Sequence, residues 1–173
     1  MAVGLVGAFG ATAATYFLYS DDPVYRISEK IYRLPDFRVE PGTARKRMVI
    51  VHGTDPNKMV RAAVDKLDGI ERFIRPGDRV VVKPNAAWDR MPEQAANTNP
   101  EVVSAVVRLV KGARPSKIVV TDVSLNDPYR AFSRSGIEAA AKEAGAEIWI
   151  PSDNDFVLTD LKGELLKVWP VSR

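Results

Sequence analysis

Residues 79–83 read RVVVK and residues 117–121 read KIVVT, two short runs of β-branched residues that are each closed by a polar one. Such runs are typical of strands that are buried within a sheet. Similar runs stand on either side of them, MVIVH at 48–52 and EIWI at 147–150. A helical pattern separates each run from the next, and parallel neighbours need a crossover of this kind. The order therefore predicts an α/β domain built on a parallel sheet.

Helix start signals support this order. Asp-Pro at 55–56 and Asn-Pro at 99–100 each supply an N-cap followed by a proline at the first helical position. SGIE at 135–138 reads as a capping box that opens an alanine-rich helix. Beyond the fourth strand, residues 156–159 and 165–169 look like the two arms of a hairpin. We thus predict a parallel βαβαβαβ sheet flanked by helices, with a C-terminal hairpin.

An uncharged stretch precedes this domain. Residues 1–19 read MAVGLVGAFGATAATYFLY, whereas the 25 Lys and Arg and the 22 Asp and Glu all follow residue 20. As a helix, the stretch would span roughly 28 Å, close to the thickness of a hydrocarbon core. It predicts one N-terminal transmembrane helix. A cleaved export leader and a buried core helix are the alternatives.

One face of that helix would carry small residues at three- and four-residue spacing, which lets a second helix approach closely. These are Gly4, Gly7, Ala8, Ala11 and Ala14. We therefore divide the chain into a transmembrane anchor at 1–20, a basic juxtamembrane linker at 21–47 and an α/β domain at 48–173. The expected partners are the lipid bilayer and other transmembrane subunits.

Composition excludes several classes of site. The chain has no cysteine and a single histidine, His52, so neither thiolate nor multi-histidine metal sites are possible. The net charge of +3 is too small to indicate a nucleic-acid partner. No loop follows a glycine-rich phosphate-binding pattern. We accordingly expect no metal, no cofactor and no nucleic acid, and whether the protein is an enzyme stays open.

Ligands of parallel α/β sheets bind at the carboxyl ends of the strands. Polar residues follow each predicted strand there, and residues 84–98 form an unusually long loop after the second one. Lys83 could bind an anionic group that the neighbouring asparagines orient, and aspartates beyond the third strand could act as a base or cation ligands. The candidate ligand-binding residues are Lys83, Asn85, Asn99, Asp122, Asn126, Asp127 and Arg130.

Structural roles compete with these. A lysine and an aspartate at neighbouring strand ends can form an ion pair that only stabilises the fold, and residues 126–128 can serve as a turn and N-cap. His52 is interpreted as a histidine that ends the first strand.

Three blocks carry a resemblance to a known family: KPN at 83–85, TNPEVV at 98–103 and SGIEAAAKEAGA at 135–146. Over residues 47–170 the chain resembles the domain of unknown function 362 (DUF362) family, and is most similar to bacterial members with an export leader or membrane anchor. The resemblance implies no settled reaction. Family members continue further, so we expect residues 48–173 to be the first half of the domain.

Two functions follow as hypotheses. The first is a membrane-anchored, non-catalytic accessory subunit of a larger membrane complex, single-pass in a bacterial inner membrane with its soluble domain in the periplasm. The second is an enzyme, or a protein that binds a small anionic ligand or a cation, with its site at the carboxyl edge of the sheet.

Overall fold

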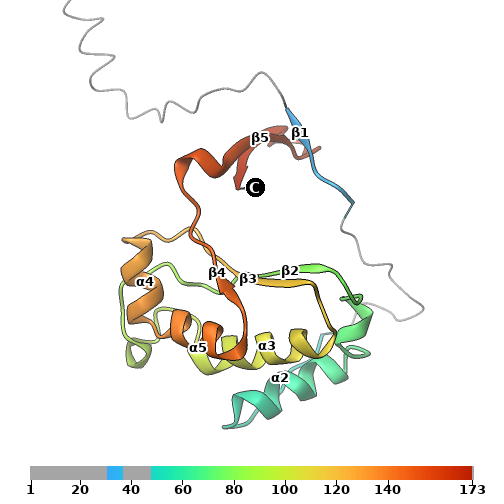
Figure 1. The fold of residues 1–173 in the computed structure, drawn as a ribbon, viewed down its shortest axis with the longest axis vertical. Coiled ribbons are helices and arrows are strands. Elements are labelled where there is room, and N and C mark those ends of the chain that lie inside the picture. The colour runs from blue at the N-terminus through green and yellow to red at the C-terminus, as the bar shows by residue number, and fades with distance from the viewer. Residues whose placement is uncertain (1–30, 37–47, 173) are drawn as a thin grey trace, which may run out of the picture. The chain divides into compact units, whose positions relative to one another are not determined.

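The structure is a computed structural model that describes residues 31–36 and 48–172. The chain divides into two compact units. The larger unit extends from Pro35 to Asp155 and holds the parallel sheet, and the smaller one joins the start of the described chain to residues from Phe156 onward. Each unit is described by itself (Figure 1).

The larger unit contains a three-stranded parallel sheet in the order β2-β3-β4. Strand β2 is Arg79–Val82, β3 is Lys117–Val120 and β4 is Glu147–Ile148. Val82 pairs with Val120, which in turn pairs with Ile148, so the three strands end at one edge. The parallel order predicted for these strands is confirmed.

Four α-helices accompany the sheet: α2 (Pro56–Asp65), α3 (Pro100–Gly112), α4 (Pro128–Arg134) and α5 (Ile137–Ala144). Figure 1 shows α3 and α5 along one face of the sheet, with α2 packed on the far side of α3. Three single turns of 3-10 helix complete the unit, at Ile70–Arg72, Pro92–Gln94 and Asp153–Asp155.

Helix starts follow the predicted chemistry. The Asp55 side chain accepts the Lys58 N–H at 3.1 Å, and the Asn99 side chain accepts the Glu101 N–H at 2.8 Å. Each cap satisfies an amide that has no partner within the helix, and the proline that follows loses no hydrogen bond. Both predicted N-caps are confirmed.

The core lies between the sheet and the helices that cover it. Fully buried side chains there include Val107 of α3, Val120 of β3, Phe132 of α4 and Ile137 of α5. Burial of apolar area of this kind is the main favourable term in folding, so the covered face fixes the arrangement of α3 and α5.

The first predicted strand is wrong. Residues 48–52 have no strand pairing in the structure, and the Ile50 side chain is 69% exposed. A run of β-branched residues forms a strand only where a neighbouring strand satisfies its backbone groups, and context overrides its propensity elsewhere. Among the described residues the parallel sheet therefore has three strands, and the exposed His52 does not end a strand.

The predicted capping box at 135–138 is also wrong. Ser135 instead closes α4, the helix that begins at the N-cap Asp127 as the alternative interpretation of residues 126–128 allowed, and Gly136 begins α5 at a φ of 74°. Glycine adopts this left-handed conformation without strain, which lets two short helices meet at one residue. Glu138 forms an ion pair with Lys142 at 2.6 Å rather than capping the helix.

The smaller unit confirms the predicted hairpin. Strand β5 (Phe156–Asp160) pairs antiparallel with β6 (Val168–Ser172), so the second arm begins three residues later than expected. Strand β1 (Tyr32–Arg33) pairs parallel with β5 and was not predicted, because a two-residue strand leaves no period to detect.

No helix within residues 31–36 and 48–172 has the length and apolar character needed to cross a bilayer. The predicted anchor at 1–20, with its small residues Gly4, Gly7, Ala8, Ala11 and Ala14, lies outside the described residues, as does most of the linker at 21–47.

Substitution of two isoleucines tests whether the sheet includes residues 117–120 but not residues 48–52. Ile118, on the central strand β3, is 7% exposed. Ile118→Ala should lower the free energy of unfolding by about 2–5 kcal/mol, since it leaves a cavity in the core. Ile50→Ala should change it by no more than about 0.5 kcal/mol. Chemical denaturation followed by circular dichroism measures both, and equal losses would mean that residues 48–52 are packed as a strand after all.

Candidate functional site

Lys83 and Asp122 meet at the carboxyl edge of the parallel sheet. The Lys83 Nζ lies 2.6 Å from the Asp122 Oδ1. The lysine side chain is 67% exposed, while that of the aspartate is 5% exposed. The second carboxylate oxygen accepts the Ala86 N–H at 2.8 Å. The buried carboxylate is thus held by both the end of β2 and the loop that follows it, and it holds an exposed cation in place.

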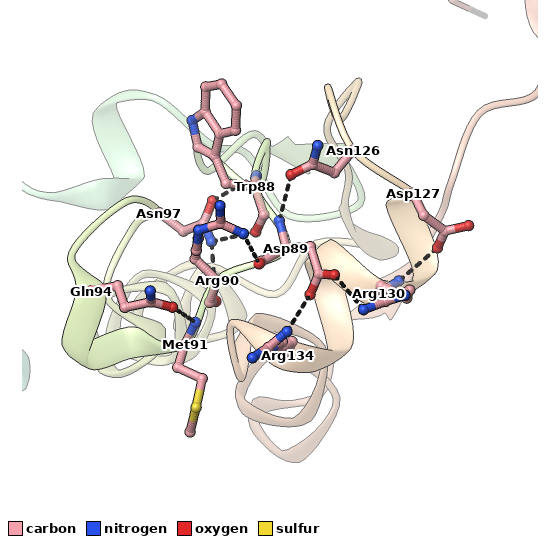
Figure 2. Close-up of polar contacts among 10 residues, drawn as sticks. All are labelled: Trp88, Asp89, Arg90, Met91, Gln94, Asn97, Asn126, Asp127, Arg130 and Arg134. Atoms are coloured by element: carbon pink, nitrogen blue, oxygen red, sulfur yellow. Dashed lines mark hydrogen bonds and ion pairs between the residues drawn. The ribbon is translucent and has the colours of Figure 1, made fainter.

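The long loop at 84–98 is closed by its own polar side chains. The Asn85 side-chain amide donates to the Ala96 carbonyl at 3.1 Å, and the Asn85 N–H donates to the Thr98 hydroxyl at 2.9 Å. Asn97 accepts the Trp88 N–H at 3.0 Å and donates to the Trp88 carbonyl at 2.8 Å (Figure 2). These bonds replace the backbone ladder that a regular element would supply.

Residues after β3 fasten the same loop. The Ser124 hydroxyl donates to the Ala86 carbonyl at 2.7 Å, and the Leu125 N–H donates to the Ala87 carbonyl at 3.0 Å. The Asn126 side chain accepts the Asp89 N–H at 3.0 Å. The loops after two neighbouring strands therefore form one connected surface.

Asp89 forms ion pairs with two arginines of α4. Its carboxylate lies 2.8 Å from Arg130 Nη2 and 3.4 Å from Arg134 Nη1, and its side chain is only 14% exposed (Figure 2). Arg130 and Arg134 are four residues apart on a helix, so they project from the same face. Arg130 was among the predicted ligand residues, whereas Asp89 and Arg134 were not; the i, i+4 pair of arginines was the signal available.

The structure assigns most of the predicted ligand residues to structural tasks. Asn99 and Asp127 cap α3 and α4, with the Asp127 carboxylate 2.9 Å from the Arg130 N–H. Asn85 and Asn126 hold the loop backbone. Lys83 and Asp122 come together as expected, while Arg130 joins Asp89. Within the part of the chain described, no three His, Cys, Asp or Glu residues are grouped as a metal site.

The segment after β4 is also held by hydrogen bonds between its own residues. The Ser152 N–H donates to the Asp155 carboxylate at 2.7 Å and the Ser152 hydroxyl does so at 2.8 Å. The backbone hydrogen bond, followed by that of the hydroxyl, lowers the pKa of Asp155 because both stabilise its charged form.

A groove of about 640 Å³ lies elsewhere, among α2, α3 and α5. Arg108 lines it and contacts Asn57 at 3.3 Å and Glu143 at 3.8 Å. The strand-end residues do not line this groove. This groove and the predicted ligand-binding residues at the strand ends therefore occupy different places in the unit.

Asp122 should contribute substantially to the stability of the carboxyl edge of the sheet. Asp122→Ala leaves the Ala86 N–H unpaired in a buried place and should cost about 1–3 kcal/mol of unfolding free energy. Asp65→Ala, an exposed aspartate of α2, should change it by less than about 0.5 kcal/mol. Denaturation curves of the two variants give the comparison, and a loss as small as that of the control would contradict the role of Asp122.

Comparisons with known proteins identify one similar protein and the family of this chain. A thylakoid-associated protein of Synechocystis sp. is 43% identical to the chain over 54 residues, which are 31% of this chain and 17% of that protein. The matched stretch thus covers about a sixth of the relative's length. No solved structure matches the chain. The family described as "Domain of unknown function (DUF362)" matches residues 80–173, more than half of the chain, so the protein belongs to the DUF362 family.

Proposed function

We propose that this DUF362 protein is a membrane-anchored, non-catalytic accessory subunit of a larger membrane complex. Residues 1–20 would cross a bacterial inner membrane once, and the soluble domain would stand in the periplasm. The observation that carries the proposal is the uncharged stretch at 1–19, which is long enough to span a hydrocarbon core. Its small residues Gly4, Ala8 and Ala11 suit contact with another transmembrane helix.

The strand-end site supports a structural role for the domain. The Asn85 side chain donates to loop backbone, that of Asn126 accepts from loop backbone, and that of Asp127 caps α4. These contacts fasten the edge of the sheet, which favours a structural role for the three residues. A rigid edge of this kind suits a surface that contacts other molecules.

The comparison supports a membrane location. The relative that shares 43% identity over 54 residues is a thylakoid-associated protein. We extend that association to this chain as part of the proposal. We further propose that the chain belongs to the exported branch of the family and that residues 48–173 correspond to the first half of the domain, following the order of the KPN, TNPEVV and SGIEAAAKEAGA blocks.

Enlarging the small residues tests the partner helix. In the double variant Ala8→Ile and Ala11→Ile, the face that approaches a partner is filled, so the complex should shrink or dissociate while the protein stays in the membrane. Ala13 falls on the opposite side of the expected helix, since successive residues are about 100° apart. Ala13→Ile is thus a control of the same chemistry. Native electrophoresis and co-purification after mild detergent extraction measure the complex.

Two outcomes would contradict the accessory role. One is a wild-type protein that migrates as a monomer in mild detergent. The other is a complex that Ala13→Ile disrupts as strongly as the double variant does, because the small-residue face would then have no special part in assembly.

A second candidate function rests on Lys83. Its Nζ is held 2.6 Å from a buried carboxylate while its side chain is mostly exposed, and it stands at the edge where α/β sheets bind ligands. A small anionic ligand would be bound there as by a point charge. Asp122 would affect the bound ligand only by positioning Lys83.

Inorganic phosphate probes this second function. Lys83→Gln should weaken phosphate binding by about tenfold, the effect of losing about 1.4 kcal/mol of attraction. Lys58→Gln removes another exposed lysine, on α2, and should leave the affinity unchanged. Isothermal titration of the detergent-solubilised protein measures both. If Lys83→Gln binds phosphate as wild type does, or if neither protein binds it, Lys83 is a structural partner of Asp122.

A further inference from the structure

We propose that the groove among α2, α3 and α5 binds a linear polyamine of the size of spermidine. The groove has a volume of about 640 Å³, which is within the range of small-molecule sites. It lies in the larger unit, away from the carboxyl edge of the sheet. The inference goes beyond the proposed function and does not depend on the membrane anchor.

Two helices that run in the same direction form the long walls of the groove. α3 and α5 pack side by side (Figure 1), and a Cβ atom added to Gly136 at the start of α5 would lie 3.5 Å from Pro100 at the start of α3. Two turns further along, Arg108 Nη2 of α3 lies 3.8 Å from Glu143 Oε1 of α5. The starts of both helices therefore define one end of the groove, and Arg108 and Glu143 define the other.

Polar side chains follow one another along α3. Glu101, Ser104 and Arg108 all line the groove, and their spacing of three and four residues places them on one face of the helix. At about 1.5 Å per residue, Ser104 lies roughly 4.5 Å along the axis from Glu101, and Arg108 roughly 10 Å. Because Glu143 lies beside Arg108, the carboxylates of Glu101 and Glu143 stand at opposite ends of the groove, roughly 10 Å apart.

Carboxylates outnumber cations in the groove. Its lining includes Asp55, Glu101 and Glu143 but only one cationic residue, Arg108. Asp55 also contacts Lys58 at 3.7 Å, whereas Glu101 has no ion-pair partner among the described residues. Even when Lys58 is counted, one negative charge is left over, so the groove favours a cationic ligand.

The Ser104 hydroxyl is a second, independent indication of a ligand. Ser104 is 6% exposed, and its hydroxyl forms no hydrogen bond with another described residue. The oxygen is not completely enclosed, because Ser172 alone among the described residues has a fully buried polar side-chain atom without a partner. Since Ser104 lines the groove, its oxygen opens onto it. A nearly buried hydroxyl is normally hydrogen bonded, and a ligand with an N–H group would satisfy it.

A linear polyamine matches this arrangement. Its amines are protonated at neutral pH, as the lysine side chain is. In extended spermidine the terminal nitrogens are about 11 Å apart and the central nitrogen is about 5 Å from the nearer of them, given bond lengths of about 1.5 Å. The terminal ammonium groups thus reach Glu101 and Glu143 while the central one donates to Ser104. The methylenes contact small residues of α5, which are Gly136, Ala139 and Ala140.

Titration calorimetry of the full-length protein in a non-ionic detergent measures spermidine binding. Glu101→Gln should weaken it by about tenfold, because the carboxylate that pairs with an ammonium group becomes neutral. Glu71→Gln neutralises an exposed glutamate outside the groove and should leave the affinity unchanged. Ala139→Leu should abolish binding, since the larger side chain fills the groove without changing its charge.

The diamine 1,8-diaminooctane isolates the role of Ser104. It has the length of spermidine but carries a methylene group in place of the central amine, so it has nothing to donate to the hydroxyl. Ser104→Ala should weaken spermidine binding by about fivefold and leave the affinity for 1,8-diaminooctane unchanged. Equal losses for the two amines would remove Ser104 from the site.

The inference is overturned if the wild-type protein does not bind spermidine, if Glu71→Gln weakens binding as much as Glu101→Gln, or if Ala139→Leu binds as wild type does. Circular dichroism establishes that each variant is folded. Because Glu101→Gln changes charge and Ala139→Leu changes shape, either folded variant decides the question alone. A protein that binds spermidine but is not held in membranes would contradict only the proposed anchor.

Discussion

The carboxylate of Asp122 connects the parts of the carboxyl edge. It stands two residues beyond β3, is almost completely buried, and accepts hydrogen bonds from the backbone of Ala86 and from Lys83. A buried carboxylate requires such partners, because an unpaired charge away from water is very costly. The end of β2, the start of the long loop and the end of β3 are therefore fixed relative to one another. The hydrogen bond from Asp89 to Asn126 and the ion pair of Asp89 with Arg130 connect the loop further to the residues after β3 and to α4.

Part of this architecture could be predicted from residue types alone. The runs at 79–83 and 117–121 became strands, and Asp55 and Asn99 became N-caps, because local chemistry decided each outcome. The run at 48–52 is similarly rich in β-branched residues but pairs with no strand among the described residues, and whether a partner is present depends on the fold as a whole. Ser135 failed as a cap because Gly136 allowed two helices to meet there, which a capping pattern does not reveal.

The candidate site, too, could be predicted only in part from the sequence. That Lys83 and Asp122 would meet followed from their positions at neighbouring ends of parallel strands. The use of Asn85 and Asn126 as loop fasteners did not follow, because an asparagine in a loop can bind a ligand or a backbone group equally well. Asp89 was passed over because its two arginine partners lie more than forty positions further along the chain.

In the function proposed above, the N-terminal stretch anchors this DUF362 protein in a membrane and the folded domain presents its firmly held edge to other subunits. The proposed function depends above all on the claim that residues 1–20 anchor the chain. Alkaline carbonate extraction of membranes from cells that express the full chain tests it most directly. The account predicts that the protein stays in the membrane pellet at its full mass, and its release into the supernatant, or the loss of about twenty N-terminal residues from the mature protein, would contradict it.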